Sequence, residues 1–122
     1  MNNKPIYPIS VLSNLLNVHQ RSLRIYDELG ILSPKRNDKN RRMYSNNDLE
    51  KAKLILYLTR NLALNMMGVR LILAMIEDKK IESKNYIPFV KNIVEKININ
   101  EEDNIIKTAR RGRKRGNNIL MK

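Results

Sequence analysis

A glutamine and two arginines lie close together near the start of a short periodic segment, with a serine between them. These residues are Gln20, Arg21, Ser22 and Arg24. Arginine forks and glutamine amides match the paired donor and acceptor atoms that guanine and adenine present in the DNA major groove. The segment therefore offers side chains for direct contact with bases, while a solvated helix face is the alternative for any one arginine considered alone.

A second set of basic and aromatic residues follows, and its types favour contact with the sugar-phosphate backbone. The set is Tyr26, Lys35, Arg36, Arg41, Arg42 and Tyr44. Cationic side chains and tyrosine hydroxyls bond to phosphate oxygens, which positions a protein on a duplex without distinguishing the bases. Two alternatives stay open: Tyr44 packs in the core with its hydroxyl at the rim, and Tyr26 packs between helices.

Two short helices must present the first set. Residues 9–16 and 20–29 both carry apolar side chains at helical spacing. Ser10 is of a capping type at the start of the first, and Gly30 follows the second as a natural stop. The polar face of the second helix shows Asp27 beside the arginines. The tight turn between the two segments predicts a helix-turn-helix.

A small hairpin must present the second set. Residues 31–36 and 41–44 are short extended segments around the turn-forming residues 37–40, and Pro34 is tolerated because both strands of such a ribbon are edges. A basic hairpin directly after a helix-turn-helix is a wing. The expected fold is therefore mainly α: a winged helix-turn-helix with a two-stranded wing.

Two longer helices complete the expected domain, which spans residues 1–78. Ser45 with Asp48 predicts a capping box, and a helical stripe continues to about Asn61. Asn65 is of a type that caps a fourth helix, over residues 66–76. This helix is apolar nearly all round, so we expect it to be buried on more than one side, with its methionines Met66, Met67 and Met75 in the core.

The segment after this domain predicts self-association. Residues 79–98 form a linker and a fifth helix, whose apolar stripe is Ile87, Val90, Val94 and Ile97. The stripe favours packing on a second subunit, with docking back on the core as the alternative. Residues 99–122 are expected to form a disordered basic tail that binds nucleic acid nonspecifically or only adds charge. Its proposed contacts are Arg110, Arg111, Arg113, Lys114 and Arg115.

Charge and composition limit the function classes. The 122 residues include 24 Lys and Arg against 12 Asp and Glu, a net charge of +12, which indicates a polyanionic partner. There is no cysteine and His19 is the single histidine, so we expect no metal site and no cofactor. Without a catalytic constellation, we expect no enzyme activity. No membrane segment or signal peptide is evident, which favours a cytoplasmic, nucleoid-associated protein.

The order of several motifs resembles the MerR family of winged helix-turn-helix regulators over residues 7–77. They are Leu23-Arg24, Tyr26, Gly30-Ile31-Leu32, Pro34, Arg36, Arg42 and Tyr44. Residues 62–69 are similar to the heat-shock repressor branch of that family. The resemblance implies a homodimeric repressor of chaperone genes that binds an inverted-repeat operator in double-stranded DNA, with a chaperone as co-regulator. It also implies that Arg24, Arg36, Arg42 and Tyr44 face DNA.

Another class of protein fits the same charges. A nonspecific or architectural nucleic-acid-binding protein, similar to an excisionase, would use a winged scaffold and basic residues without base readout. Competition between a specific duplex, random duplex and single-stranded RNA distinguishes these classes.

Overall fold

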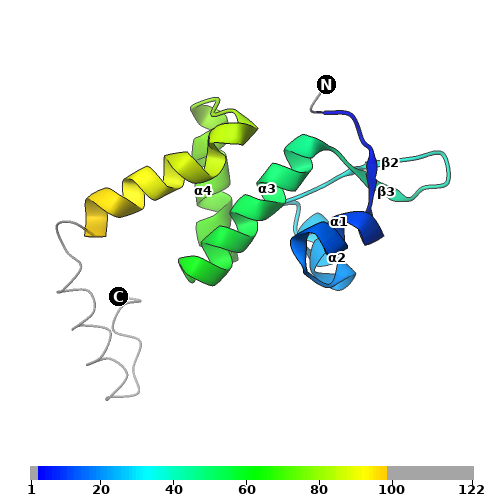
Figure 1. Cartoon of the computed structure of the whole chain (residues 1–122), viewed down its shortest axis with the longest axis horizontal. Coiled ribbons are helices and arrows are strands. Elements are labelled where there is room, and N and C mark those ends of the chain that lie inside the picture. Colours follow the sequence, from blue (N-terminus) through cyan, green and yellow to red (C-terminus); the bar gives the residue numbers. More distant parts are fainter. Residues whose placement is uncertain (1–2, 99–122) are drawn as a thin grey trace, which may run out of the picture. The chain divides into compact units, whose positions relative to one another are not determined.

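The computed structural model of the chain describes residues 3–98, which include several helices and a small antiparallel sheet (Figure 1). The chain divides into two units, Met1–Ile87 and Pro88–Lys122. Within the described residues, no helix has the length and apolar composition needed to cross a membrane.

The helix-turn-helix consists of α1 (Ile9–Leu16) and α2 (Gln20–Glu28). Asn17 ends α1 in the left-handed region at φ 55°, which asparagine tolerates better than most residues, and the turn leads to His19 at the N-cap of α2. The expected capping role of Ser10 is wrong. The N-cap of α1 is Pro8, whose extended backbone at φ −62° starts the helix without a side-chain cap.

The sheet has three strands in the order β1-β3-β2. β2 (Lys35–Arg36) and β3 (Arg42–Tyr44) pair antiparallel and form the predicted wing. β1 (Tyr7–Pro8) is an additional strand that no sequence pattern predicts, and it pairs with the other edge of β3. β3 is therefore paired along both of its edges.

The helix α3 (Asn46–Leu56) begins directly after β3, at the predicted capping box. The Asp48 amide donates to Ser45 Oγ at 3.1 Å, and the Ser45 amide donates to Asp48 Oδ2 at 2.9 Å. The helix ends earlier than expected, because the last predicted turn adopts π-helical geometry as η1 (Tyr57–Asn61). Two reciprocal hydrogen bonds thus fix the junction between wing and scaffold.

The helix α4 (Met66–Asp78) starts at Asn65, whose Oδ1 accepts from the Gly68 amide at 2.9 Å. The expectation that α4 is buried on several sides is wrong. Met67 is 70% exposed, and Leu71 and Met75 are also exposed. α4 packs on η1 along one face, so the methionines of its outer face lie outside the core.

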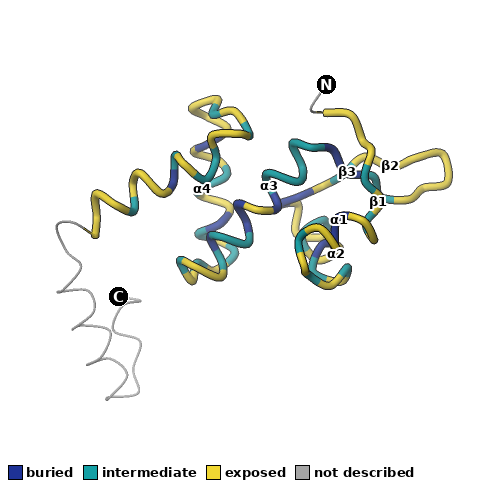
Figure 2. The backbone as a smooth tube through the Cα atoms, viewed as in Figure 1, coloured by how far each residue is buried: buried dark blue, intermediate teal, exposed yellow. Residues whose placement is uncertain are grey.

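The core of the first unit lies between α1, α2, α3 and α4 (Figure 2). Its fully buried side chains include Leu12, Leu23, Tyr44, Leu54, Ile55, Leu58 and Val69. Three of these buried side chains, Leu54, Ile55 and Leu58, belong to α3 and η1. Burial of this apolar surface is the main source of stability in such a small domain.

After the 3-10 helix η2 (Ser83–Asn85), residues 86–98 are helical, with Pro88 in the first turn. Of the predicted dimerisation stripe, Val90 is buried, Ile87 and Val94 are half-buried, and Ile97 is exposed. The role of this stripe in dimerisation stays a prediction. The predicted basic tail, residues 99–122, lies outside the described residues.

Candidate nucleic-acid interface

The exposed face of α2 carries the residues predicted to contact bases. Leu23 anchors the opposite face at 0% exposure, so Arg21 and Arg24 point away from the core and are exposed. Arg24 Nη2 donates to Gln20 Oε1 at 3.0 Å, one helical turn earlier. Ser22 is half-buried between them. The pair joins neighbouring positions on one face of the helix, so Gln20 and Arg24 present their donors and acceptors side by side.

The wing carries exposed cations around a tight turn. The Asn37 Oδ1 atom accepts from the amides of Lys39 at 3.0 Å and Arg41 at 2.9 Å, and Asn40 adopts φ 62°. Asparagine suits both roles, because its short side chain bonds to nearby backbone and tolerates the left-handed region. The turn thereby holds Arg41 exposed, and Lys35 is exposed on β2.

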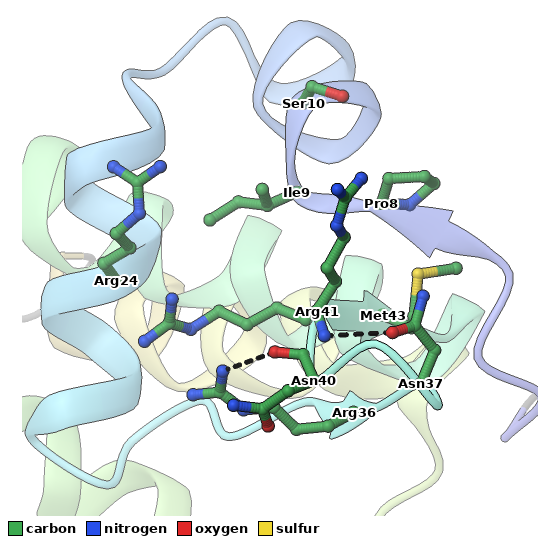
Figure 3. A pocket seen from close by; sticks show the side chains of 10 residues that line it. Pro8, Ile9, Ser10, Arg24, Arg36, Asn37, Asn40, Arg41 and Met43 are labelled. Atoms are coloured by element: carbon green, nitrogen blue, oxygen red, sulfur yellow. Dashed lines mark hydrogen bonds between the residues drawn. The ribbon is translucent and has the colours of Figure 1, made fainter.

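A hollow of about 440 Å³ lies between α2, the wing and the start of α1 (Figure 3). Its lining residues are Pro8, Ile9, Ser10, Arg24, Arg36, Asn37, Asn40, Arg41, Arg42 and Met43. Four of the ten are arginines and none is acidic. We call α2, β2, β3 and the turn between the two strands the recognition face. Its hollow concentrates positive potential where it would meet an anionic backbone.

A carboxylate behind the hollow binds two of these arginines. Asp27 Oδ2 accepts from Arg42 Nε at 2.8 Å and lies 3.5 Å from Arg36 Nη2. Asp27 is on α2, Arg36 on β2 and Arg42 on β3, so one carboxylate links three elements. The sequence pattern predicts for Asp27 only a place on a polar helix face, and spacing alone gives no sign of this contact.

The two tyrosines differ from the other predicted contacts. Tyr44 is 0% exposed, and its hydroxyl has no hydrogen-bond partner among the described residues. Tyr44 is therefore a core residue, as one alternative predicts, but the expected position of its hydroxyl at the rim is wrong, because the hydroxyl is buried too. It does not reach a phosphate in this conformation. Burial raises the pKa of Tyr44 to about 12, against the opposing influence of Arg42. Tyr26 is half-buried, and burial also raises its pKa.

The part of the chain that the structure describes contains no group of three or more His, Cys, Asp or Glu residues suited to hold a metal ion. The interface offers instead guanidinium, amide and hydroxyl donors. Such donors suit phosphate oxygens and base edges.

A family model described as "MerR HTH family regulatory protein" matches residues 7–76. The chain belongs to the MerR family. The match covers the sheet, both helices of the helix-turn-helix, α3 and nearly all of α4, and the family consists of DNA-binding transcriptional regulators.

Among curated MerR-like relatives, heat shock protein HspR of Streptomyces coelicolor is 36% identical over 69 residues, covering 57% of this chain and 46% of that protein. The HTH-type transcriptional regulator GlnR of Bacillus anthracis is also 36% identical, over 75 residues, covering 62% of this chain and 57% of the relative. The chain thus spans about half the length of the curated relatives it matches.

Solved structures share the MerR fold. The HTH-type transcriptional regulator SkgA of Caulobacter crescentus aligns with a TM-score of 0.59 at 19% identity, covering 87% of this chain and 73% of SkgA. MtaN, the N-terminal part of the Bacillus subtilis multidrug transporter activator, aligns with a TM-score of 0.54 at 24% identity, covering 86% and 95%. These likenesses establish the fold.

Proposed function

We propose that this MerR-family chain is a sequence-specific, homodimeric repressor that binds an inverted-repeat operator in double-stranded DNA. The observation that carries the proposal is the arginine-lined hollow between α2 and the wing, next to the hydrogen-bonded Gln20–Arg24 pair. A helix that presents paired donors beside a basic wing has the parts needed for base readout and for backbone contact.

In this proposal, α2 enters the major groove. Gln20, Arg21, Ser22 and Arg24 contact bases or adjacent phosphates, while Lys35, Arg36, Arg41 and Arg42 contact the backbone. The proposed DNA contacts are best supported for the residues whose side chains are exposed, which are Arg21, Arg24, Lys35, Arg36 and Arg41. Arg42 is half-buried against Asp27, so less of its side chain is open to the backbone than in the other three wing residues, and it also holds the wing.

The homodimer would form through the 86–98 helix and its stripe at Ile87, Val90, Val94 and Ile97. Two subunits related by a two-fold axis would present two α2 helices to half-sites about one helical turn, or a multiple of it, apart. Sedimentation of the full chain at several concentrations tests this. A monomer at all concentrations that still bound an inverted repeat would overturn the dimer proposal.

For target genes, we propose chaperone promoters, with a chaperone as co-regulator. The support is the similarity of residues 62–69 to heat-shock repressors, together with the identity to HspR. GlnR relatives match with equal identity over a slightly longer span. Genome-wide mapping of bound DNA separates the two: enrichment at chaperone promoters supports the heat-shock role, whereas their absence from the bound set overturns it.

The experiment that tests sequence-specific binding is selection from a random duplex library by the full chain, followed by competition. We expect an enriched inverted repeat that random duplex and single-stranded RNA displace weakly. Equal displacement by all three would favour the alternative of a nonspecific binding protein. A strong DNA bend with little sequence preference would favour the architectural alternative.

The basic tail would add affinity without adding sequence preference. Deleting residues 107–122 should weaken binding to selected and random duplex by the same factor and reduce the dependence of binding on salt, because fewer phosphate counterions are released. An unchanged salt dependence would remove the tail from the proposed interface.

A further inference from the structure

Two arginines of the wing are directly opposite each other across the strand pair. Arg36 on β2 and Arg42 on β3 are register partners. Like charges at directly opposed positions of an antiparallel pair destabilise that pair. The hairpin that borders the hollow therefore contains a built-in repulsion, which some other group must compensate.

Asp27 supplies that compensation from a different element. Its Oδ2 atom accepts from Arg42 Nε at 2.8 Å, with the two side chains only 20% and 18% exposed. The same oxygen lies 3.5 Å from Arg36 Nη2, whose side chain is 41% exposed. A short, charge-assisted hydrogen bond with limited solvent access is stronger than an exposed ion pair, so Arg42 is the firmer of the two links.

The linkage continues to the tip of the wing. Arg36 Nη1 donates to the carbonyl oxygen of Asn40 at 3.1 Å. The amide of the next residue, Arg41, donates to Asn37 Oδ1 at 2.9 Å. Polar contacts thus run from Asp27, at the C-terminal end of α2, to the exposed turn, and they set where Arg41 lies relative to Arg24 on α2.

We propose that Asp27 is a positioning residue that fixes the wing relative to α2 and so determines how strongly the protein prefers its own DNA sequence over random DNA. The inference rests on the proposed function. Asp27 lies behind the hollow and does not line it, so it acts through the arginines. Its carboxylate also neutralises charge that would otherwise be available to any phosphate.

Loss of this carboxylate has two opposite consequences. Arg36 and Arg42 become available to neutralise phosphates, which strengthens binding to every sequence and makes it more salt-dependent. Meanwhile, the wing loses its fixed position relative to α2. The base contacts of α2 and the backbone contacts of the wing then no longer form together at a single position on the duplex. Nonspecific affinity rises while sequence preference falls, a combination that simple unfolding does not produce.

The test uses the full chain and the duplex that it enriches most strongly from a random library, with a random duplex of equal length as competitor. For D27N, we expect the ratio of affinities for the selected and random duplex to fall about tenfold, the size of one lost bidentate base contact. The slope of log affinity against log salt on random duplex should become steeper by about 1. D27E should retain most of the wild-type ratio.

Two further variants distinguish the positioning role of Asp27 from a simple effect of net charge. Glu28 is the exposed neighbour of Asp27, so E28Q makes the same change in net charge and should leave the ratio unchanged. R42K keeps the positive charge but removes the Nε donor, and we expect its ratio to fall with little change in slope. R42K also serves as the decisive variant if thermal unfolding shows that D27N does not fold.

The outcomes are distinguishable. If the wild-type chain enriches no sequence, the proposed function fails and this inference fails with it. If it enriches one, and both D27N and R42K keep the ratio within about twofold of wild type, only the role of Asp27 is overturned. An equal fall of the ratio in E28Q would also overturn it, because net charge would then explain the effect.

Discussion

The recognition face and the scaffold of α3, η1 and α4 are built from different interactions. The recognition face is organised by charge-assisted hydrogen bonds that meet at Asp27, and its arginines are mostly exposed. The scaffold is organised by burial, with Leu54, Ile55 and Leu58 at 0% exposure. Burial contributes to folding in both regions, since Leu23 and Tyr44 are also 0% exposed, whereas the proposed affinity and sequence preference depend on the exposed side chains of the recognition face alone.

The largest effect should come from the scaffold. L54A removes a fully buried side chain of α3, and we expect the free energy of unfolding to fall by about 2–5 kcal/mol, because transfer and cavity terms add. Chemical denaturation measures this loss. Leu15 on α1 is 57% exposed, so L15A is a matched control and should cost much less; equal losses would break the comparison.

The next effect should appear in DNA binding alone. R24A removes the exposed guanidinium that pairs with Gln20, and we expect binding to the selected duplex to weaken by about 1–3 kcal/mol, with relaxed preference at one base pair. The melting temperature should hardly change, as for the exposed control K53A on α3. A uniform loss on all sequences would make Arg24 a phosphate contact.

A pH effect should arise where the two regions meet, at Tyr44. Burial raises the pKa of Tyr44 to about 12, whereas the unfolded tyrosine ionises near pH 10. Between these values the unfolded chain loses a proton that the folded chain keeps, so stability falls as pH rises, by up to about 2 kcal/mol near pH 12. Denaturation at pH 9 to 12 measures the fall.

The control for this effect is Y44F. It removes a buried hydroxyl that has no partner among the described residues, so stability near neutral pH should be unchanged or slightly higher. Its pH dependence should be shallower than that of the wild type. Parallel curves for the two proteins would show that Tyr44 keeps an ordinary pKa.

The smallest effect concerns two left-handed positions, one after α2 and one before α4. Gly30 after α2 has φ +72° and no heavy atom within 4 Å of the place that a Cβ atom would take, whereas Ala63 before α4 has φ 55°. We expect G30A to destabilise and A63G to stabilise the fold, each by about 1 kcal/mol or less. Thermal unfolding measures both. Shifts of the same sign would contradict the conformational explanation.

Sequence patterns predicted most of the helices and several of their ends. The capping box at Ser45, the cap at Asn65 and the left-handed glycine at Gly30 all occur as expected. These features depend on residues within a few positions of each other, so the local sequence contains the information. The family followed from motifs in the same region, and the match over residues 7–76 confirms it.

Other features depend on which segments meet in space. β1 is two residues long, too short for any periodic pattern, and it exists only because β3 offers a free edge. The exposure of Met67 follows from how few elements cover α4, which its apolar composition does not reveal. Asp27 and Arg42 are far apart in sequence, so their contact could not be predicted from spacing, and the proposed interface contacts stay predictions.

The pairing of β1 with β3 has a consequence for how the protein gains its activity. Tyr7 pairs with Tyr44, and α1 and α2 lie between these two residues in the sequence. The pairing of β1 with β3 therefore closes a long loop that contains both helices. Local helices form quickly, whereas contacts between distant segments carry a larger loop-closure entropy and form later. We therefore expect a refolding chain to recover its helical circular dichroism before it recovers DNA binding. In the interval the helices have formed but the chain does not yet bind DNA.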